Sequence, residues 1–197
     1  MNSHLLQRIC FRARSYLHRA VSSLRHVYWG IQGMRIGRST ILSRVFATWP
    51  HQVQIGKHCV IEADVVFKFD GIWAEGPSIV IDDGCFIGRG SEFNIRKGLH
   101  IGRASAIASG CKIVDHDHGI VGVRMDERPG KEGAVVLGEH VWLGANVIVL
   151  KGVKIGDSAV VGAGSVVTKS IPAGEIWAGV PAAKIGSRVR HNSSLNG

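Results

Sequence analysis

The strongest constraint in this 197-residue chain is an apolar residue that returns every six positions. The longest unbroken run consists of Leu137, Leu143, Val149, Ile155, Val161 and Val167. An α-helix repeats at roughly 3.6 residues and a strand at two, so neither explains a fixed period of six. That period is typical of a parallel β-helix, in which each hexad forms one short side of a coil. The chain is therefore predicted to be an all-β solenoid.

The same spacing recurs upstream in three shorter runs: Ile55, Ile61 and Phe67; Ile81, Ile87 and Phe93; and Ile101, Ile107 and Ile113. Three hexads make a triangular coil, and coils whose strands pair would stack about 4.8 Å apart. Glycine often follows the apolar residue, as at Gly138 and Gly144, and we interpret it as a conformational requirement at the corners. We expect coils over residues 36–185, with a loop at 114–136 and a polar C-terminal tail at 186–197.

Composition agrees with one compact repeat domain, because 45% of the residues are hydrophobic and 20% are charged. Cys59, Cys85 and Cys111 all occupy the fifth position of a hexad, where Ser105 and Ala159 stand elsewhere. We interpret these cysteines as small interior residues and not as a disulfide framework. A reducing cytoplasm is the compartment that fits this usage.

The net charge of +9 lies entirely near the N-terminus. Residues 1–61 contain eight arginines and Lys57, and the first acidic residue is Glu62. Within residues 1–35, apolar residues recur at helical spacing with arginines between them, which predicts a basic amphipathic helix. No uninterrupted run of 18 apolar residues occurs, so a membrane-spanning helix is not expected. Nucleic-acid binding is not expected either, because no recognition fold accompanies the basic segment.

Two roles for the segment 1–35 remain open, and they can coexist. The helix either caps the open end of the solenoid or lies against an anionic membrane surface. We expect the protein to be located in the cytoplasm. If the helix binds the membrane, the protein would lie peripherally at the inner face of the cell membrane.

The stretch "VWLGANVIVLKGVKIGDSAVVGAGSVVTKSIPAGEIWAGVPAAKI" resembles the C-terminal signature of the hexapeptide-repeat acyltransferases. That family includes galactoside, maltose, nodulation-factor and polysaccharide O-acetyltransferases, and the resemblance extends over most of residues 53–185. It implies a left-handed coil, an exception to the usual right-handed parallel crossover. It also implies a homotrimer with active sites between subunits, acetyl-CoA as co-substrate, and no metal.

The hexads stop between Ile113 and Leu137, where the segment begins with Asp115, His116, Asp117 and His118. Matching the family's catalytic histidine, counted from Ile107, leads to His118, and an imidazole suits proton transfer near neutral pH. His118 is the predicted general base, with His116 as the alternative because the Asp-His motif is doubled. Asp115 or Asp117 either orients the imidazole or holds the loop by its own turn.

Further site residues follow from the same resemblance and from chemistry. Asn94 is a candidate hydrogen-bond partner of the acceptor. Trp73, in the bulge "KFDGIWAEGPS", offers an apolar face to a sugar ring, or else simply holds that bulge in place. The family match puts Trp142, Ala145, Ala163, Thr168 and Lys169 along the path of the acyl donor. Lys169, Lys184 and Arg188 are candidates for the nucleotide phosphates, although the family often has a basic residue directly after "GVPA", where this chain has Ala183.

The resemblance implies an acetyl-CoA-dependent O-acetyltransferase that modifies a hydroxyl of a sugar or of a surface-polysaccharide or lipopolysaccharide precursor. Antibiotic O-acetylation is the alternative within the family, and a non-catalytic membrane-associated scaffold is an alternative from another class. A γ-type carbonic anhydrase with zinc on His100, His116 and His118 is disfavoured. That family requires two histidines five residues apart, and His116 and His118 are separated by two.

Overall fold

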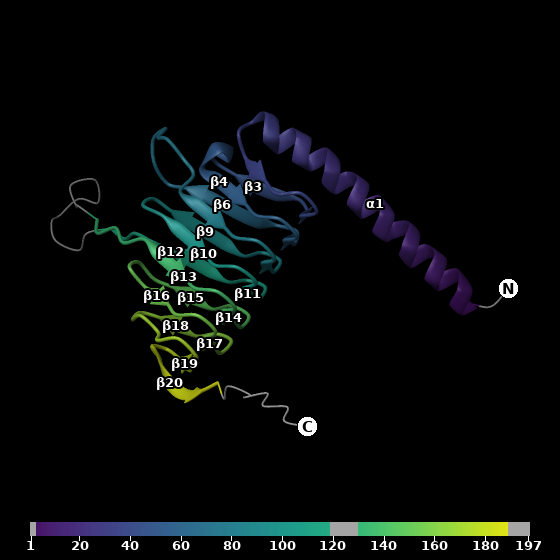
Figure 1. Ribbon diagram of the computed structural model, residues 1–197. Coiled ribbons are helices and arrows are strands. Elements are labelled where there is room, and N and C mark those ends of the chain that lie inside the picture. The colour runs from purple at the N-terminus through teal and green to yellow at the C-terminus, as the bar shows by residue number, and fades with distance from the viewer. Residues whose placement is uncertain (1–2, 119–129, 189–197) are drawn as a thin grey trace, which may run out of the picture.

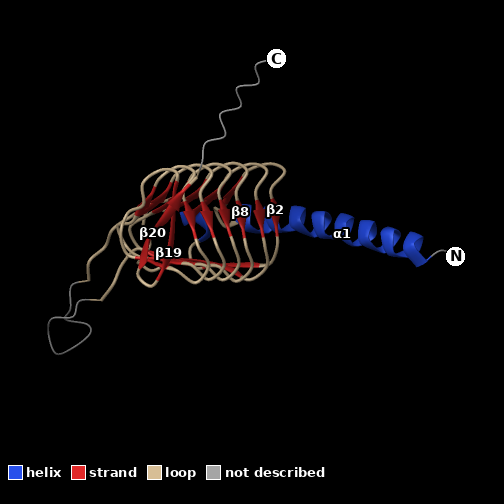
Figure 2. Ribbon diagram, turned by 90° about the horizontal axis from the view of Figure 1, so that it is seen from below, coloured by secondary structure: helices blue, strands red, loops and turns tan. Residues whose placement is uncertain are grey.

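The computed structural model describes residues 3–118 and 130–188. It consists of a long helix, α1 (Ser3–Ile31), followed by a stack of triangular coils (Figures 1 and 2). Each coil contributes one short strand to each of three sheets, which form the walls of a prism. The left-handed parallel β-helix with an N-terminal helix, predicted from the hexads and the family resemblance, is confirmed.

The first wall contains β1 (Arg35–Ile36), β4 (Val53–Ile55), β7 (Ile79–Ile81), β10 (Leu99–Ile101), β13 (Val135–Leu137) and β16 (Lys154–Ile155). The second contains β2 (Ile41–Leu42), β5 (Val60–Ile61), β8 (Phe86–Ile87), β11 (Ala106–Ile107), β14 (Trp142–Leu143), β17 (Val160–Val161), β19 (Glu175–Gly179) and β20 (Ala182–Ser187). The third contains β3 (Val45–Ala47), β6 (Val65–Phe69), β9 (Glu92–Ile95), β12 (Lys112–Val114), β15 (Ile148–Val149) and β18 (Val166–Val167). A 3₁₀ turn, Pro50–Gln52, precedes β4. Pairing between coils is parallel, and the final hairpin β19–β20 is antiparallel.

The core consists of the recurring apolar residues, which stack in register from coil to coil. In the second wall, Ile61 pairs with Ile87 and Ile107 pairs with Leu143, and all four side chains are fully buried. Burial of each such side chain contributes about 1.5–3 kcal/mol. The period of six therefore gives one continuous apolar column for each wall.

The three cysteines predicted to be interior are buried, and none forms a disulfide. The Cys85 thiol donates to the Gly102 carbonyl of the next coil, with the sulfur and oxygen 3.2 Å apart. Ser105 makes the equivalent contact with the Gly138 carbonyl at 3.0 Å. The fifth hexad position thus selects small side chains that can bond to the neighbouring coil.

The glycine that follows the apolar residue has a different role from the one expected. Gly102 and Gly144 do not adopt a positive φ. A Cβ on Gly102 would lie 2.5 Å from the Gly138 carbonyl carbon, and one on Gly144 would lie 2.6 Å from the Ala163 nitrogen. These glycines are needed because adjacent coils approach too closely for any side chain. The left-handed conformation occurs two residues later, as at Ala104 with φ of 55°.

The chain leaves the hexad pattern chiefly at one of the three corners. We name this corner, between the third and first walls, the loop edge; among the described residues it contains 70–78, 96–98, 115–118 and 130–134. The corner between the second and third walls, the alanine edge, contains residues 144–147 and 162–165. The remaining corner, the opposite edge, contains residues 138–141, 156–159 and 172–174.

Helix α1 covers the end of the first coil through polar contacts. The Ser22 hydroxyl is buried and accepts the Leu42 N–H at 2.8 Å, and Arg25 donates to the Leu42 carbonyl at 3.2 Å. His26 donates to the Thr40 carbonyl at 2.9 Å. These bonds satisfy backbone groups of β2 and of the residue before it, which have no further coil to pair with. The N-terminal half of the helix projects beyond the stack (Figure 1).

Substitution of Gly102 by alanine tests the close approach of the coils. Because the new Cβ would collide with backbone, we expect a loss of about 1–3 kcal/mol in the free energy of unfolding, measured by thermal or urea denaturation. Gly30→Ala is the matched control, since a Cβ there meets nothing within 4 Å. Equal stability of Gly102→Ala and the unsubstituted protein would contradict the packing argument.

Candidate functional site

The two ends of the long loop are fastened together where they leave the coil. The Asp117 N–H donates to the Lys131 carbonyl at 3.1 Å, and the Lys131 N–H donates to Asp117 Oδ1 at 2.8 Å. The Gly133 N–H donates to the Asp115 carbonyl at 2.8 Å, and the Lys151 ammonium pairs with the Asp117 carboxylate. We call residues 115–118 together with 130–133 the loop neck. It places His118, which is exposed, at the outer end of a well-braced segment.

Asp115 connects the loop neck to the preceding coil. Its side chain is fully buried and accepts three backbone N–H groups, those of Arg96 at 2.8 Å and of Lys97 and Gly98 at 2.7 Å. A buried carboxylate is tolerated when its oxygens are this well satisfied. The turn 96–98 and the start of the loop are consequently fixed to each other.

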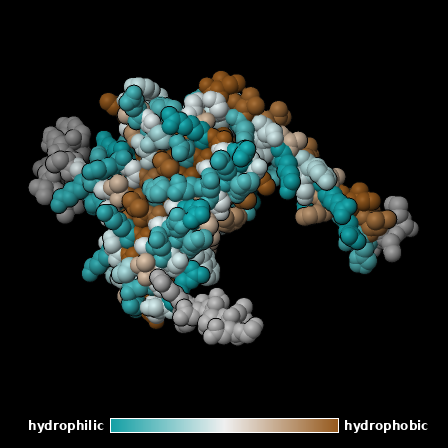
Figure 3. All heavy atoms as spheres, viewed as in Figure 1, coloured by the Kyte–Doolittle hydropathy of each residue, from teal (hydrophilic) through white to brown (hydrophobic). Residues whose placement is uncertain are grey.

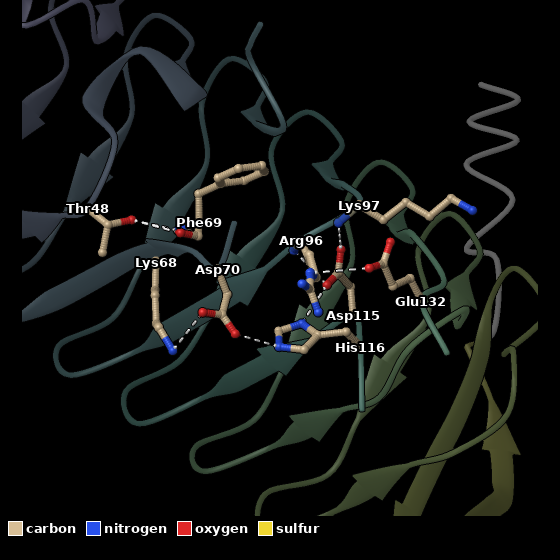
Figure 4. A network of polar contacts seen from close by, with 9 residues as sticks. All are labelled: Thr48, Lys68, Phe69, Asp70, Arg96, Lys97, Asp115, His116 and Glu132. Atoms are coloured by element: carbon tan, nitrogen blue, oxygen red, sulfur yellow. Dashed lines mark hydrogen bonds and ion pairs between the residues drawn. The ribbon is translucent and has the colours of Figure 1, made fainter. Parts of the chain in front are cut away.

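His116 lies between two carboxylates (Figure 4). Its side chain is 5% exposed, with Nδ1 3.0 Å from Asp115 Oδ1 and Nε2 3.1 Å from Asp70 Oδ2. Both ring nitrogens must donate if both carboxylates are ionised, which is the hydrogen-bonding pattern of an imidazolium. Neither nitrogen of His116 is left with a free lone pair to face a hydroxyl, whereas His118 is exposed.

Asp70 begins the bulge at 70–78 and comes from a coil two turns before His116. Partial burial raises the pKa of Asp70, but the Lys68 ammonium, 3.5 Å away, and His116 lower it by more, so the pKa lies below its ordinary value. Asp70 is therefore ionised at neutral pH and available to hold His116. This contact links the bulge directly to the loop neck.

Of the two residues predicted to contact the acceptor sugar, Asn94 lies beside this network, and Trp73 lies on the bulge that Asp70 begins. Asn94 pairs in register with Lys68 on one side and Val114 on the other, and its buried Oδ1 has no hydrogen-bond partner among the described residues. Trp73 is 64% exposed on the loop edge and stacks on the His51 ring, with the ring centroids 5.8 Å apart. The stacking on His51 agrees with a support for the bulge, and the exposure of the ring agrees with an apolar face for a sugar.

The residues predicted to bind the acyl donor fall into separate groups. Trp142, 54% exposed, points outward from β14, and Ala145 and Ala163 stack on the alanine edge, where the Gly164 N–H donates to the Ala145 carbonyl at 2.8 Å. Thr168 and Lys169 follow β18 and are exposed.

The last two basic candidates lie elsewhere. Lys184 pairs with Glu175 at 2.6 Å, and this hydrogen bond, together with one from Trp177, lowers the pKa of Glu175. Arg188 donates to the Ser158 carbonyl at 3.3 Å on the opposite edge, beside an open cleft of ≈ 620 Å³. Within one chain, neither residue shares an edge with Ala145 and Ala163.

Among the described residues, no group of three His, Cys, Asp or Glu side chains is close enough together to hold a metal ion. His100 lies on the outer face of the first wall, where its Nε2 is 3.0 Å from Asp82 Oδ2.

Sequence reasoning did not identify Asp70 or Lys151 as neighbours of the loop. Asp70 is 46 residues before His116, and Lys151 is 34 residues after Asp117. The only available signal was that both stand where the chain turns between the third and first walls. Their convergence depends on how the coils stack.

Comparison with known proteins agrees with this architecture. A family profile described as "Bacterial transferase hexapeptide (six repeats)" matches residues 134–169, and one described as "Hexapeptide repeat of succinyl-transferase" matches residues 78–114. A point mutant of the N-acyltransferase AntD from Bacillus cereus, in complex with dTDP-4-amino-4,6-dideoxyglucose and coenzyme A, has the same fold. It superposes with a TM-score of 0.74 over 84% of this chain and 89% of its own, at 22% identity.

Two proteins of Escherichia coli K12 are similar in sequence. The chain is 35% identical over 190 residues to WbbJ, named as a lipopolysaccharide biosynthesis O-acetyl transferase, a match that covers 85% of this chain and 94% of WbbJ. It is 51% identical to galactoside O-acetyltransferase over 47 residues, which are 24% of this chain and 23% of that enzyme. Repeats, coil and full-length similarity together establish that the chain belongs to the hexapeptide-repeat acyltransferase family.

Proposed function

We propose that this protein is an acetyl-CoA-dependent O-acetyltransferase with His118 as its general base. The observation that supports this role most directly is the contrast between two neighbouring histidines. His116 has both ring nitrogens committed to carboxylates, while His118 is exposed at the end of the loop neck. A general base needs a lone pair that reaches the acceptor, and His118 is the candidate that meets this requirement.

The reaction is a direct transfer. The imidazole of His118 takes the proton from an acceptor hydroxyl as that oxygen attacks the thioester carbonyl of acetyl-CoA. A carbon–oxygen bond forms, the carbon–sulfur bond breaks, and the proton is returned to the departing sulfur of coenzyme A. Backbone N–H groups lining the active site are expected to stabilise the oxyanion that develops from the thioester carbonyl.

The carboxylates have positioning roles in this scheme. Asp115 fixes the turn 96–98 and His116, Asp70 holds His116 from the other side, and Asp117 closes the loop neck against Lys131. Neither Asp115 nor Asp117 is expected to donate or accept a proton during transfer. Their combined effect is to restrict where His118 can lie, which lowers the entropic cost of reaching the reactive geometry.

The acceptor is proposed to bind along the loop edge. Asn94 is half-buried and is proposed to hydrogen-bond a sugar hydroxyl through its side-chain amide, and the exposed ring of Trp73 can cover a sugar face. The likeness to WbbJ favours a sugar of a surface polysaccharide or a lipopolysaccharide precursor as the substrate class.

The active enzyme is proposed to be a homotrimer. His118 lies at the loop edge, whereas Ala145 and Ala163 lie at the alanine edge, so one chain does not bring base and donor path to the same corner. The outward residues of the second wall also form an apolar column suited to burial against another copy. That column consists of Ile41, Val60, Phe86, Ala106, Trp142, Val160 and Ile176.

The enzyme is proposed to work in the cytoplasm, with a peripheral position at the inner face of the cell membrane. No helix of the described residues is long and apolar enough to cross a membrane.

Replacement of His118 by alanine tests the base. We expect kcat to fall by about 10²–10⁴-fold with nearly unchanged acetyl-CoA affinity, measured as free-thiol release with a panel of sugar and antibiotic acceptors. Activity that survives in His118→Ala but is lost in His116→Ala would move the base by two residues. Thiol release with antibiotics alone would favour the xenobiotic alternative, and none with any acceptor would favour a scaffold.

Replacement of Ala163 by tryptophan tests the donor path. A large side chain on the alanine edge is expected to block coenzyme A, with binding measured by calorimetry and folding by circular dichroism. Lys57→Trp places the same ring at the same hexad position on the opposite edge, at an exposed residue without a positive φ, and is expected to bind normally. Unchanged binding by a folded Ala163→Trp protein would remove this edge from the site.

A further inference from the structure

Helix α1 has two faces, and only one of them contacts the coils. Ser22, Arg25 and His26 bond to β2 and its flanks. Leu24 lies two residues after Ser22, which places it about 160° away around a helix of 3.6 residues per turn. The face centred on Leu24 therefore points away from the solenoid.

This outward face carries an uninterrupted apolar stripe over the whole length of the helix. Its members recur at intervals of three or four residues and are Leu6, Ile9, Ala13, Leu17, Ala20, Leu24, Val27 and Ile31. The six large members are between 49% and 82% exposed. Figure 3 shows hydrophobic side chains, in brown, along the outer side of the helix. We call these eight residues the outer stripe.

Burial of the outer stripe is not part of the capping function. The cap is made by the opposite face, through its polar contacts and through Trp29, which packs against the core, and it would persist if every residue of the stripe were hydrophilic. An apolar face that continues past the end of the solenoid indicates a partner outside this chain.

The charges beside the stripe identify the kind of partner. Arg8, Arg12 and Arg19, at spacings of four and seven, follow one border of the stripe, and α1 contains no acidic residue. A second copy of the same helix would bring like charges together. An anionic lipid surface matches both features, because aliphatic chains accept the stripe and lipid phosphates accept the guanidinium groups.

We propose that α1 lies in the plane of an anionic bilayer, with the outer stripe inserted and the coil stack held on the cytoplasmic side by the opposite face. The same helix thus closes the solenoid and attaches it to a membrane. This arrangement does not depend on the identity of the catalytic base.

The test is co-sedimentation of the full chain with two kinds of vesicle, phosphatidylcholine alone and equal parts of phosphatidylcholine and phosphatidylglycerol. We expect binding to the anionic vesicles that weakens as salt is raised. Ile9→Glu, within the stripe, is expected to lower the bound fraction roughly tenfold because a carboxylate would have to enter the lipid. Gln7→Glu adds the same charge on the other face and is expected to bind almost as well as the unsubstituted protein.

Thiol release with a soluble acceptor separates this proposal from the catalytic one, since Ile9→Glu is expected to leave that activity unchanged. The proposal is overturned if the full chain ignores anionic vesicles at low salt, or if both variants lose binding equally. It is also overturned if Ile9→Glu changes the mass in solution and no vesicle binding is seen, because the stripe would then be covered by a second copy.

Discussion

The close stacking of the coils is the constraint on which the rest of this structure depends. Parallel backbone hydrogen bonds join each strand to the next coil. They bring the two backbones so close that a Cβ on Gly102 would lie 2.5 Å from the Gly138 carbonyl carbon. A coil can add or lose residues only where this contact is not required. The close contact between adjacent coils therefore maintains the six-residue period in the sequence.

The extra residues are inserted mainly at the loop edge. From the second coil onward, the other two corners keep the six-residue spacing, so the second and third walls stay in register. The bulge 70–78, the turn 96–98 and the long loop all leave at the remaining corner. Because coils stack directly above one another, residues separated by tens of positions meet there. The polar network of Asp70, His116 and Asp115 is the product of three insertions at one edge.

The charged side chains of the coils differ from those of α1 in how they are paired. The paired charges of the coils satisfy each other locally, as Arg44 and Arg89 do with Asp64, whose pKa they lower. The arginines of α1 have no acidic residue on their own helix. The polar face of α1 closes the first coil, which leaves the apolar face and most of its arginines available for another surface.

The sequence by itself determined the solenoid, its three-sided coil, the N-terminal helix and the site of the loop. These features follow from periodicity, because each hexad must bury one apolar residue wherever it lies in the chain. The Asp-His doublet was equally visible, and the family match selected His118 from it. Sequence could not separate the two histidines physically, since His116 is distinguished by Asp70, which only coil stacking brings within 3.1 Å.

The tertiary structure also decided three other matters. The glycine after each apolar residue is needed for contact between coils, and a local pattern contains no information about the next coil. The donor candidates divide among edges, which places Arg188 away from Ala163. Periodicity showed that α1 is amphipathic, but only the folded chain shows that its polar face is the one that contacts the solenoid. In each case the deciding quantity is a distance between segments remote in sequence, and that distance is set by packing.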